Sequence, residues 1–275
     1  MQVMRSENGV EFLQWALPRL GFRWSGFRKP RGQVLKRIRK RMEELGLAGG
    51  YDQYRDYLNE NPQEWEHLDR LCYVSISKFL RDRKLWDFIR DELLCELMRA
   101  DRPGQVAIWS VGCCNGEEPY GIAIMADQLS PNSAEAGNVS ILATERNREL
   151  LERARRGRYP GGALRELSEQ ELKTYFRKTE DPEAQYEITG RLRRYIEFEE
   201  RDIRVSMPAR RFDLVFCRNL VFTYFEHKEQ TAFLRKLQPR IKPGGCLVIG
   251  SNEELPDAGR LEQITGTHPV YRTTG

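Results

Sequence analysis

The stretch from Ile108 to Met125 constrains the fold of this chain more than any other part of the sequence. Its first residues suit a short buried strand. Gly112 and Gly116 then bracket a tight turn, and Pro119 stands where the first turn of a helix tolerates proline. A strand that turns through glycines into a helix brings the backbone close to a ligand and points helix N–H groups at it. The stretch therefore predicts an α/β sheet with a ligand site at the glycine turn.

The residues of this turn restrict the kind of ligand. Cys114 stands where the dinucleotide-binding fingerprint requires a middle glycine. Glu117 and Glu118 would place two negative charges where the phosphates of a dinucleotide bind. A ligand with hydroxyl groups and a positive centre fits better, and S-adenosylmethionine (SAM) is such a ligand. For this stretch alone, an α/β turn that binds no nucleotide stays the alternative.

Composition sets the broad class of protein. The chain has 275 residues, enough for one large domain or two smaller ones, and its 40% apolar content is ordinary for a globular protein. The sequence contains no run of eighteen apolar residues, so it predicts no membrane span. The N-terminus lacks the apolar core of a signal peptide, and we therefore expect a cytoplasmic protein. Six cysteines without a C-x-x-C pair favour small core residues over disulfides or a metal site.

Positive charge is concentrated in one stretch. Between Arg19 and Arg41 the chain has ten lysines and arginines and no acid. Within it, apolar residues recur at helical spacing from Val34 to Leu45, which predicts an amphipathic helix with a basic outer face. Such a face is either merely solvated or an electrostatic guide to an acidic partner. No recognised nucleic-acid motif accompanies it, so nucleic acid is not favoured.

The domain boundary is predicted from the Asp-Arg-Pro-Gly segment at residues 101–104, the clearest linker in the chain. We expect a helical domain over residues 1–100 and an α/β domain over residues 105–275. A polar segment without α/β rhythm predicts an insertion at about residues 158–197, with short strands near 185–188 and 192–195. Pro243-Gly244-Gly245 predicts a turn into a strand over residues 246–250.

Two further sites follow predicted strands. Glu145 ends the strand at residues 139–144, where an acid can accept hydrogen bonds from ribose hydroxyls. Arg218 and Asn219 follow the strand at residues 212–217, at the edge where open α/β sheets bind ligands. The sequence therefore predicts that these side chains gather at one edge of the sheet.

Six motifs, in this order, make the chain resemble the CheR-type protein-glutamate methyltransferases, which methylate bacterial chemoreceptors with SAM. The resemblance covers about residues 32–272 and is carried by Ile76-Ser-Lys-Phe-Leu-Arg-Asp82, Gly112-Cys-Cys-Asn-Gly-Glu-Glu-Pro-Tyr120, Ala143-Thr-Glu145, Ala154-Arg-Arg-Gly-Arg-Tyr159, Phe212-Asp-Leu-Val-Phe-Cys-Arg-Asn219 and Lys242-Pro-Gly-Gly-Cys-Leu-Val-Ile-Gly250.

The resemblance implies a class I SAM-dependent methyltransferase fold (Rossmann-like, doubly wound), with an N-terminal all-helical domain and a small inserted β subdomain. It implies that the basic helix Val34–Leu45 meets an acidic protein substrate through Arg37, Arg39, Lys40 and Arg41. It implies these cofactor-binding residues: Ser75, Ser77, Arg81, Gly112, Glu118, Glu145, Asp202, Ile203, Arg218 and Asn219.

The implied catalytic residues are Arg81, which would orient the acceptor carboxylate, and Tyr224, which would donate to it. The family places a tyrosine near the reactive methyl group, and here Thr223 stands at that spacing with Tyr224 one residue later. Either the loop bulges by one residue and Tyr224 takes the role, or the acceptor pocket differs. For Arg81 an interdomain salt bridge, and for Tyr224 a core position, are the alternatives.

Three functions remain open from the sequence. The first is a SAM-dependent O-methyltransferase of glutamate side chains, which needs no general base because a carboxylate is already ionised at pH 7. The second is an enzyme of the same fold that methylates a small molecule at O, N or S. The third is a non-catalytic regulator that binds SAM or its product S-adenosylhomocysteine (SAH). The sequence leaves the oligomeric state open.

Overall fold

A computed structural model describes residues 4–75, 77–99, 104–130 and 139–274, with the side chains of residues 4–8 left aside. The chain forms two compact units. The helical unit contains residues 1–74 and 219–232, and the sheet unit contains residues 75–218 and 233–275. Within the described residues, no helix is both long and apolar enough to cross a membrane.

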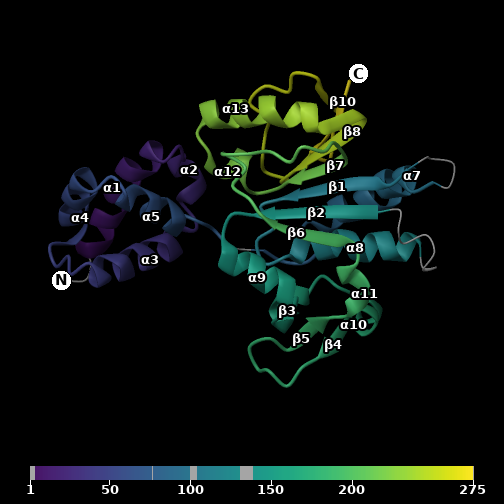
Figure 1. Cartoon of the computed structure of the whole chain (residues 1–275), viewed down its shortest axis with the longest axis horizontal. Helices are drawn as coiled ribbons and strands as arrows, with labels where there is room; N and C mark the ends of the chain where they lie inside the picture. The colour runs from purple at the N-terminus through teal and green to yellow at the C-terminus, as the bar shows by residue number, and fades with distance from the viewer. Residues whose placement is uncertain (1–3, 76, 100–103, 131–138, 275) are drawn as a thin grey trace. The chain divides into compact units, whose positions relative to one another are not determined.

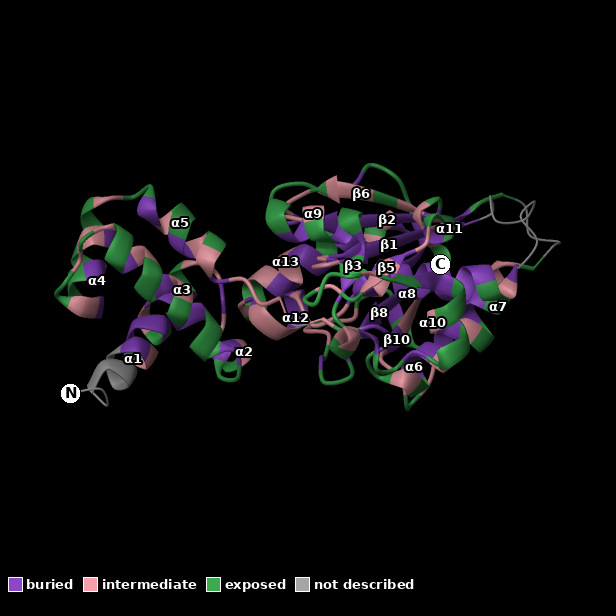
Figure 2. Cartoon of the chain, turned by 90° about the horizontal axis from the view of Figure 1, so that it is seen from below, coloured by how far each residue is buried: buried purple, intermediate pink, exposed green. Residues whose placement is uncertain are grey.

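The helical unit is built from short amphipathic helices whose apolar stripes face inward (Figure 2). Its helices are α1 (Met4–Arg19), α2 (Trp24–Phe27), α3 (Arg31–Glu44), α4 (Gly50–Glu60), α5 (Glu64–Leu71) and α12 (Val221–Tyr224). The predicted basic helix corresponds to α3. Helix α12 joins the unit from far along the sequence, because the backbone N–H of Arg23 donates to the Tyr224 carbonyl (2.8 Å) and that of Glu226 donates to the Gly21 carbonyl (2.8 Å).

A buried carboxylate links three helices of this unit. Glu64 of α5 is 5% exposed and accepts two hydrogen bonds from the Arg41 guanidinium of α3 (3.0 and 2.9 Å). It also accepts one from the hydroxyl of Tyr54 in α4 (2.9 Å). Burial acts to raise the pKa of Glu64, but the hydrogen bonds from Arg41 and Tyr54 outweigh it and hold that pKa below its ordinary value. The Arg41–Glu64–Tyr54 network therefore keeps Glu64 ionised and fastens α3, α4 and α5 together.

The sheet unit contains a seven-stranded sheet in the order β6-β2-β1-β7-β8-β10-β9, which confirms the predicted α/β sheet (Figure 1). Its strands are β1 (Val106–Val111), β2 (Val139–Glu145), β6 (Ile196–Glu200), β7 (Phe212–Cys217), β8 (Ile241–Ile249), β9 (Leu261–Gln263) and β10 (Val270–Thr273). Strands β6, β2, β1, β7 and β8 pair in parallel, whereas β10 is antiparallel to β8 and β9. Parallel pairing brings the carboxyl ends of β1, β2 and β7 to one edge.

Helices and smaller elements accompany this sheet. The helical elements are α6 (Arg83–Phe88), the π-helix η1 (Ile89–Leu94), α7 (Cys95–Leu97), α8 (Glu117–Leu129), α9 (Arg148–Arg156), η3 (Gly161–Leu164), α10 (Glu169–Tyr175), α11 (Gly190–Arg193) and η4 (Gln238–Arg240). Helix α13 (His227–Leu237) begins in the helical unit and ends in the sheet unit. A second sheet, in the order β3-β5-β4, contains Arg158–Tyr159, Tyr186–Ile188 and Phe176–Lys178.

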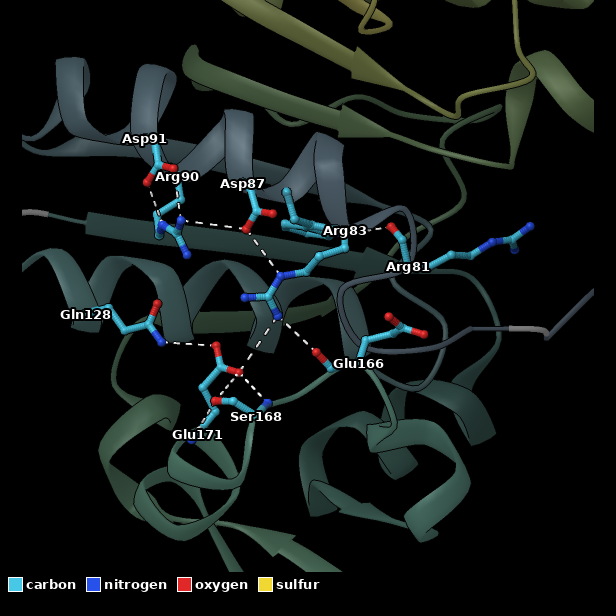
Figure 3. A network of polar contacts seen from close by, with 10 residues as sticks. Arg81, Arg83, Asp87, Arg90, Asp91, Gln128, Glu166, Ser168 and Glu171 are labelled. Carbon is cyan, nitrogen blue, oxygen red and sulfur yellow. Dashed lines mark hydrogen bonds and ion pairs between the residues drawn. The ribbon is translucent and has the colours of Figure 1, made fainter.

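The division between the units differs from the boundary that the sequence suggests at residues 101–104. The helical run α6–η1–α7 belongs to the sheet unit, because its apolar side chains lie in one core with β1 and α8. Arg83 of α6 also donates to the Glu166 carbonyl (2.9 Å) and lies 3.9 Å from the Glu171 carboxylate (Figure 3). The linker signal was strong, but the apolar face of the preceding helix decides where that helix packs.

The expected strand at residues 192–195 is wrong, since α11 occupies Gly190–Arg193. Tertiary contacts override the local pattern here. Asp127 of α8 is 1% exposed, and it accepts hydrogen bonds from Arg191 (2.7 Å) and from the hydroxyls of Tyr175 and Tyr195 (3.0 and 3.1 Å). A buried carboxylate needs such partners, and α11 brings Arg191 to it.

The expected turn at residues 243–245 is also wrong, since these residues lie within β8. The pairing of β8 with β7 shifts register between Phe212 and Leu214, which accommodates the Pro-Gly-Gly segment as an irregularity in the strand. Glycine is required because a Cβ at Gly245 would lie 2.9 Å from the Asp213 carbonyl oxygen.

Removing Arg41 should weaken the helical unit locally. In Arg41→Ala, Glu64 keeps its burial but loses two charge-assisted hydrogen bonds, so we expect the opening free energy of α3 and α5 amides to fall by about 2–3 kcal/mol at pH 7. Native-state hydrogen exchange measures this free energy. Lys36→Ala, an exposed change on the same helix, should change it by less than about 0.5 kcal/mol.

The same pair of proteins gives a pH test. Because the folded-state pKa of Glu64 lies below its ordinary value of 4.5, its contribution is present above that value and is lost as the pH falls through the folded-state pKa. The difference between wild type and Arg41→Ala should therefore narrow below pH about 4.5. A difference that stays constant down to pH about 3 would contradict the role of the ionised carboxylate.

Candidate active site

The predicted tight turn between β1 and α8 has a left-handed backbone at three positions. Gly112 (φ 68°) and Gly116 (φ 91°) lie in this region, and so does Cys114 (φ 53°), which is uncommon for a residue with a side chain. A Cβ at Gly116 would lie 3.0 Å from the Cβ of Ala154 and 3.1 Å from the Tyr159 hydroxyl. Position 116 therefore requires glycine, and the turn packs closely on α9.

Glu145 lies directly beside this turn. Its carboxylate accepts hydrogen bonds from the backbone N–H of Cys114 (3.1 Å) and of Asn147 (2.9 Å). Burial raises the pKa of Glu145 above its ordinary value, although these N–H groups favour the ionised form. The structure thus brings the end of β2 and the glycine turn together.

A buried guanidinium connects the next residues of the site. The Arg218 side chain is 5% exposed, and its guanidinium lies 2.8 Å from the Asp82 carboxylate and 3.6 Å from that of Glu118. Glu118 also accepts a hydrogen bond from the Ser110 hydroxyl (2.8 Å). Burial raises the pKa of Glu118, and the charge of Arg218 opposes that rise. Arg218, Glu118 and Asp82 therefore form one ionic cluster that links β7, α8 and the segment before α6.

Arg81 belongs to a strained segment beside this cluster. Leu80 (φ 47°) and Asp82 (φ 70°) both have left-handed backbone conformations, which cost on the order of 1–3 kcal/mol each for residues other than glycine. The Arg81 side chain is exposed and extends away from the polar network around Arg83 (Figure 3). Strain of this kind is typical of segments that the surrounding structure holds in place for function.

Ser75 and Ser77 precede the strained segment around Arg81, and Ser77 contacts the carboxylate of Glu117. Ser75 and Ser77 are half-buried. The Ser77 hydroxyl hydrogen-bonds to the carboxylate of Glu117, which is 3% exposed. Burial raises the pKa of Glu117, and its hydrogen bonds act in the other direction. Among the described residues, no hydrogen-bond partner reaches Glu117 Oε2 or Asn115 Oδ1.

Asp202 and Ile203 follow β6. Burial acts to raise the pKa of Asp202, but hydrogen bonds and charge from Arg204, together with the charge of Arg146, hold it below its ordinary value. The Arg204 guanidinium lies 2.7 Å from this carboxylate. Ile203 is 8% exposed and lines a pocket of about 380 Å³ with Lys236 and Arg240. Asp202 is therefore ionised, and the positive charges of Arg204 and Arg146 balance its negative charge.

Asn219 and Tyr224 lie in the helical unit. Asn219 has a left-handed backbone (φ 55°). Tyr224 is half-buried on α12, and its ring meets that of Phe27 edge-on, with centroids 5.1 Å apart. Thr223 lies beside it, and its carbonyl accepts a hydrogen bond from the Arg23 guanidinium (2.9 Å). Thr223 and Tyr224 both stay open as the residue at the family tyrosine position.

The outer face of α3 carries fewer available cations than the sequence suggests. Arg41 is bound to Glu64, and Arg37 donates to the carbonyls of Leu71 (3.0 Å) and Tyr73 (2.5 Å). Lys36, Arg39 and Lys40 remain exposed, and they line a shallow pocket of about 580 Å³. We call these three residues the cationic face of α3.

Comparison with known proteins shows the family of the chain. Residues 75–270 match the family model described as "CheR methyltransferase, SAM binding domain". The chemotaxis protein methyltransferase of Salmonella typhimurium is 32% identical over 248 residues, which are 86% of this chain and 80% of that protein. The chain belongs to the CheR methyltransferase family. A probable chemotaxis protein methyltransferase of Rhizobium etli is 30% identical over 249 residues, covering 88% of this chain and 92% of the relative.

Membership of the CheR family confirms the class I methyltransferase fold and makes this chain a SAM-dependent methyltransferase. The residues of the glycine turn fit that cofactor. A buried hydrogen-bond acceptor without a partner is satisfied when a ligand brings a hydrogen-bond donor. SAM has such donors in its ammonium group and its two ribose hydroxyls. The free acceptor atoms of Glu117 and Asn115, beside the N-terminus of α8, meet this requirement.

Two residues beside Arg218 and Arg81 were not predicted as site residues. Asp82 ends the first motif of the resemblance, and Trp86 lies outside all six motifs. Asp82 lies 2.8 Å from the buried Arg218 guanidinium, and the Trp86 indole N–H donates to the Arg81 carbonyl (2.8 Å). The available signal was general: a buried indole N–H needs an acceptor, and a buried arginine needs an acid.

Proposed function

We propose that this CheR-family enzyme is a protein-glutamate O-methyltransferase that transfers the methyl group of SAM to glutamate side chains of a chemoreceptor. The observation that carries the protein acceptor is the cationic face of α3, which remains exposed after Arg37 and Arg41 are used internally. An acidic helical surface complements such a face. The relatives from Salmonella typhimurium and Rhizobium etli are a chemotaxis protein methyltransferase and a probable one, which supports a receptor as the acceptor.

Within the sheet unit, we assign the carboxylates at the strand ends to the cofactor. Glu145 would accept hydrogen bonds from the ribose hydroxyls, since its neighbouring N–H donors keep it aimed at the turn. Glu118 would lie at the methionine or adenosine edge. The other assigned contacts in this unit are Ser75, Ser77, Arg81, Gly112, Asp202, Ile203 and Arg218. The roles of Asn219 and Tyr224, in the helical unit, stay predictions from the sequence.

The reaction joins two opposite charges. When bound, SAM supplies a methyl group on a sulfonium, and the acceptor supplies a carboxylate oxygen that displaces the sulfur. Charge is neutralised as the ester forms, so a site that excludes water favours the reaction. A carboxylate is ionised at pH 7, and therefore the protein needs no general base. Its main task is to hold the two reactants in line, which can contribute on the order of 7 kcal/mol or more.

Arg81 is the residue that we assign to the acceptor. A guanidinium binds a carboxylate through two parallel N–H groups and so fixes its orientation. The Arg81 side chain is exposed, and within the described part of the chain no ion pair engages it. It is therefore available for an incoming carboxylate.

The chemical nature of the product tests the function directly. Incubation with a purified chemoreceptor cytoplasmic domain and SAM labelled in its methyl group should label the receptor, and mild base should release the label as methanol. A methyl ester behaves in this way, whereas N- and S-methyl groups resist base. Label that withstands base, or label that enters only a small-molecule extract, would contradict the proposal.

Loss of Glu145 should weaken cofactor binding. Two hydrogen bonds to a charged acceptor contribute about 1.5–3 kcal/mol each, so Glu145→Ala should raise the SAH dissociation constant at least tenfold in calorimetry. Glu149→Ala, an exposed acid on α9, should leave it within twofold. An unchanged constant for Glu145→Ala would remove Glu145 from the site.

Charge reversal on the cationic face should impair receptor recognition. Lys40 (79% exposed) and Lys228 (77% exposed) each lie 3.9 Å from a glutamate, which makes them a matched pair. Lys40→Glu should raise the KM for the receptor severalfold and reduce its salt dependence, with the KM for SAM unchanged. Lys228→Glu should change neither constant. Equal effects of both variants would show that net charge, not α3, governs recognition.

A further inference from the structure

The backbone carbonyl of Arg81 is held by two side chains. The indole N–H of Trp86 donates to it (2.8 Å), and so does the guanidinium of Arg218 (3.1 Å). On either side of Arg81, Leu80 and Asp82 have left-handed backbone conformations. A strained segment keeps its shape only where its surroundings fix it, and these two hydrogen bonds act on the residue at its centre.

Trp86 is packed in the core of the sheet unit. It is 1% exposed on α6. Its ring stacks on Phe216 of β7, with centroids 5.7 Å apart and planes inclined by 15°, and the Arg218 guanidinium lies 5.3 Å from its centroid. A Cβ at Gly121 of α8 would lie 3.2 Å from Leu80 and 3.7 Å from the indole. The donor that faces the Arg81 carbonyl is therefore attached to a rigid support.

The Arg81 side chain has no comparable support of its own. It is exposed, and Figure 3 shows it extending away from the network of Arg83, Glu166 and Glu171. Among the described residues, no ion pair fixes its guanidinium. The direction of a long side chain without contacts depends on the backbone that carries it, and at Arg81 that backbone is fixed through its carbonyl.

We propose that Trp86 is a positioning residue for Arg81: its indole N–H holds the Arg81 carbonyl and thereby directs the guanidinium toward the methyl acceptor. The inference rests on the role proposed above for Arg81. It assigns to Trp86 a task that burial alone would not require, because phenylalanine, although smaller, would keep an aromatic ring between Phe216 and Gly121. What phenylalanine lacks is the N–H.

The test is a double-mutant cycle of wild type, Trp86→Phe, Arg81→Ala and the double variant. The kcat/KM for the receptor at saturating SAM and the SAH dissociation constant are measured on all four proteins. Arg81→Ala should impair at least one of these quantities. Trp86→Phe should impair the same quantity about fivefold, as expected for one neutral hydrogen bond. In the Arg81→Ala background, Trp86→Phe should change it by less than about twofold.

Trp109→Phe is the matched control. Trp109 is also fully buried in the sheet unit, lies 5.3 Å from the ring of Phe212, and donates one hydrogen bond, to the Thr144 hydroxyl (3.0 Å). It should lower the stability of the unit about as much as Trp86→Phe does. Its effect on kcat/KM should be below about twofold in both backgrounds, because its ring and hydrogen-bond partners in the described structure, Phe212 and Thr144, lie outside the Arg81 segment.

Four results would overturn the inference, and they separate it from the proposed function. If Trp86→Phe impairs the enzyme equally in both backgrounds, or impairs it no more than Trp109→Phe does, Trp86 acts only on stability. If Trp86→Phe has no effect in the wild-type background, its N–H does not position Arg81. If Arg81→Ala alone changes neither quantity, the role proposed for Arg81 itself is wrong.

Discussion

The structure of the site depends on one buried guanidinium. Arg218 follows β7 with 5% of its side chain exposed, and a buried charge at such a position is costly unless it is paired. Its partners, Asp82 and Glu118, come from the segment before α6 and from the first turn of α8. Pairing therefore fixes three parts of the chain at the carboxyl edge of the sheet. The glycine turn directly precedes α8, which carries Glu118, and Arg81 directly precedes Asp82, so both segments adjoin this cluster.

Much of the sheet unit could be predicted from sequence, because its signals are local. The structure confirms the strand–turn–helix predicted for residues 108–125, and both glycines of the turn have a left-handed backbone. Glu145 was placed at the end of β2 from the apolar run that precedes it, and it does lie beside the turn. Features that depend on residues distant in sequence were not predicted. The helix α11 forms where Arg191 reaches the buried Asp127, and the local pattern contains no trace of that contact.

The cationic stretch shows a second limit of sequence reasoning. The spacing of apolar residues distinguishes the apolar stripe of α3 from its charged face. It does not show which cations of that face bond within the protein and which stay exposed. Arg41 and Arg37 have long side chains that reach back to Glu64 and to the Leu71 and Tyr73 carbonyls, so they stabilise the helical unit. Lys36, Arg39 and Lys40 have the same charge and stay exposed. Only the positions of the acceptors decide which cations remain for a partner, and those acceptors lie up to 36 residues away.

The central claim is that the carboxylates around the glycine turn of this CheR-family protein form the binding site of SAM. Calorimetric titration of the purified wild-type chain with SAH tests it most directly, because it requires no acceptor and no turnover. The account predicts one site per chain with a dissociation constant in the micromolar range or tighter, about −8 kcal/mol. Folded protein that shows no affinity for either SAH or SAM would contradict the proposed SAM site and the functions that depend on it.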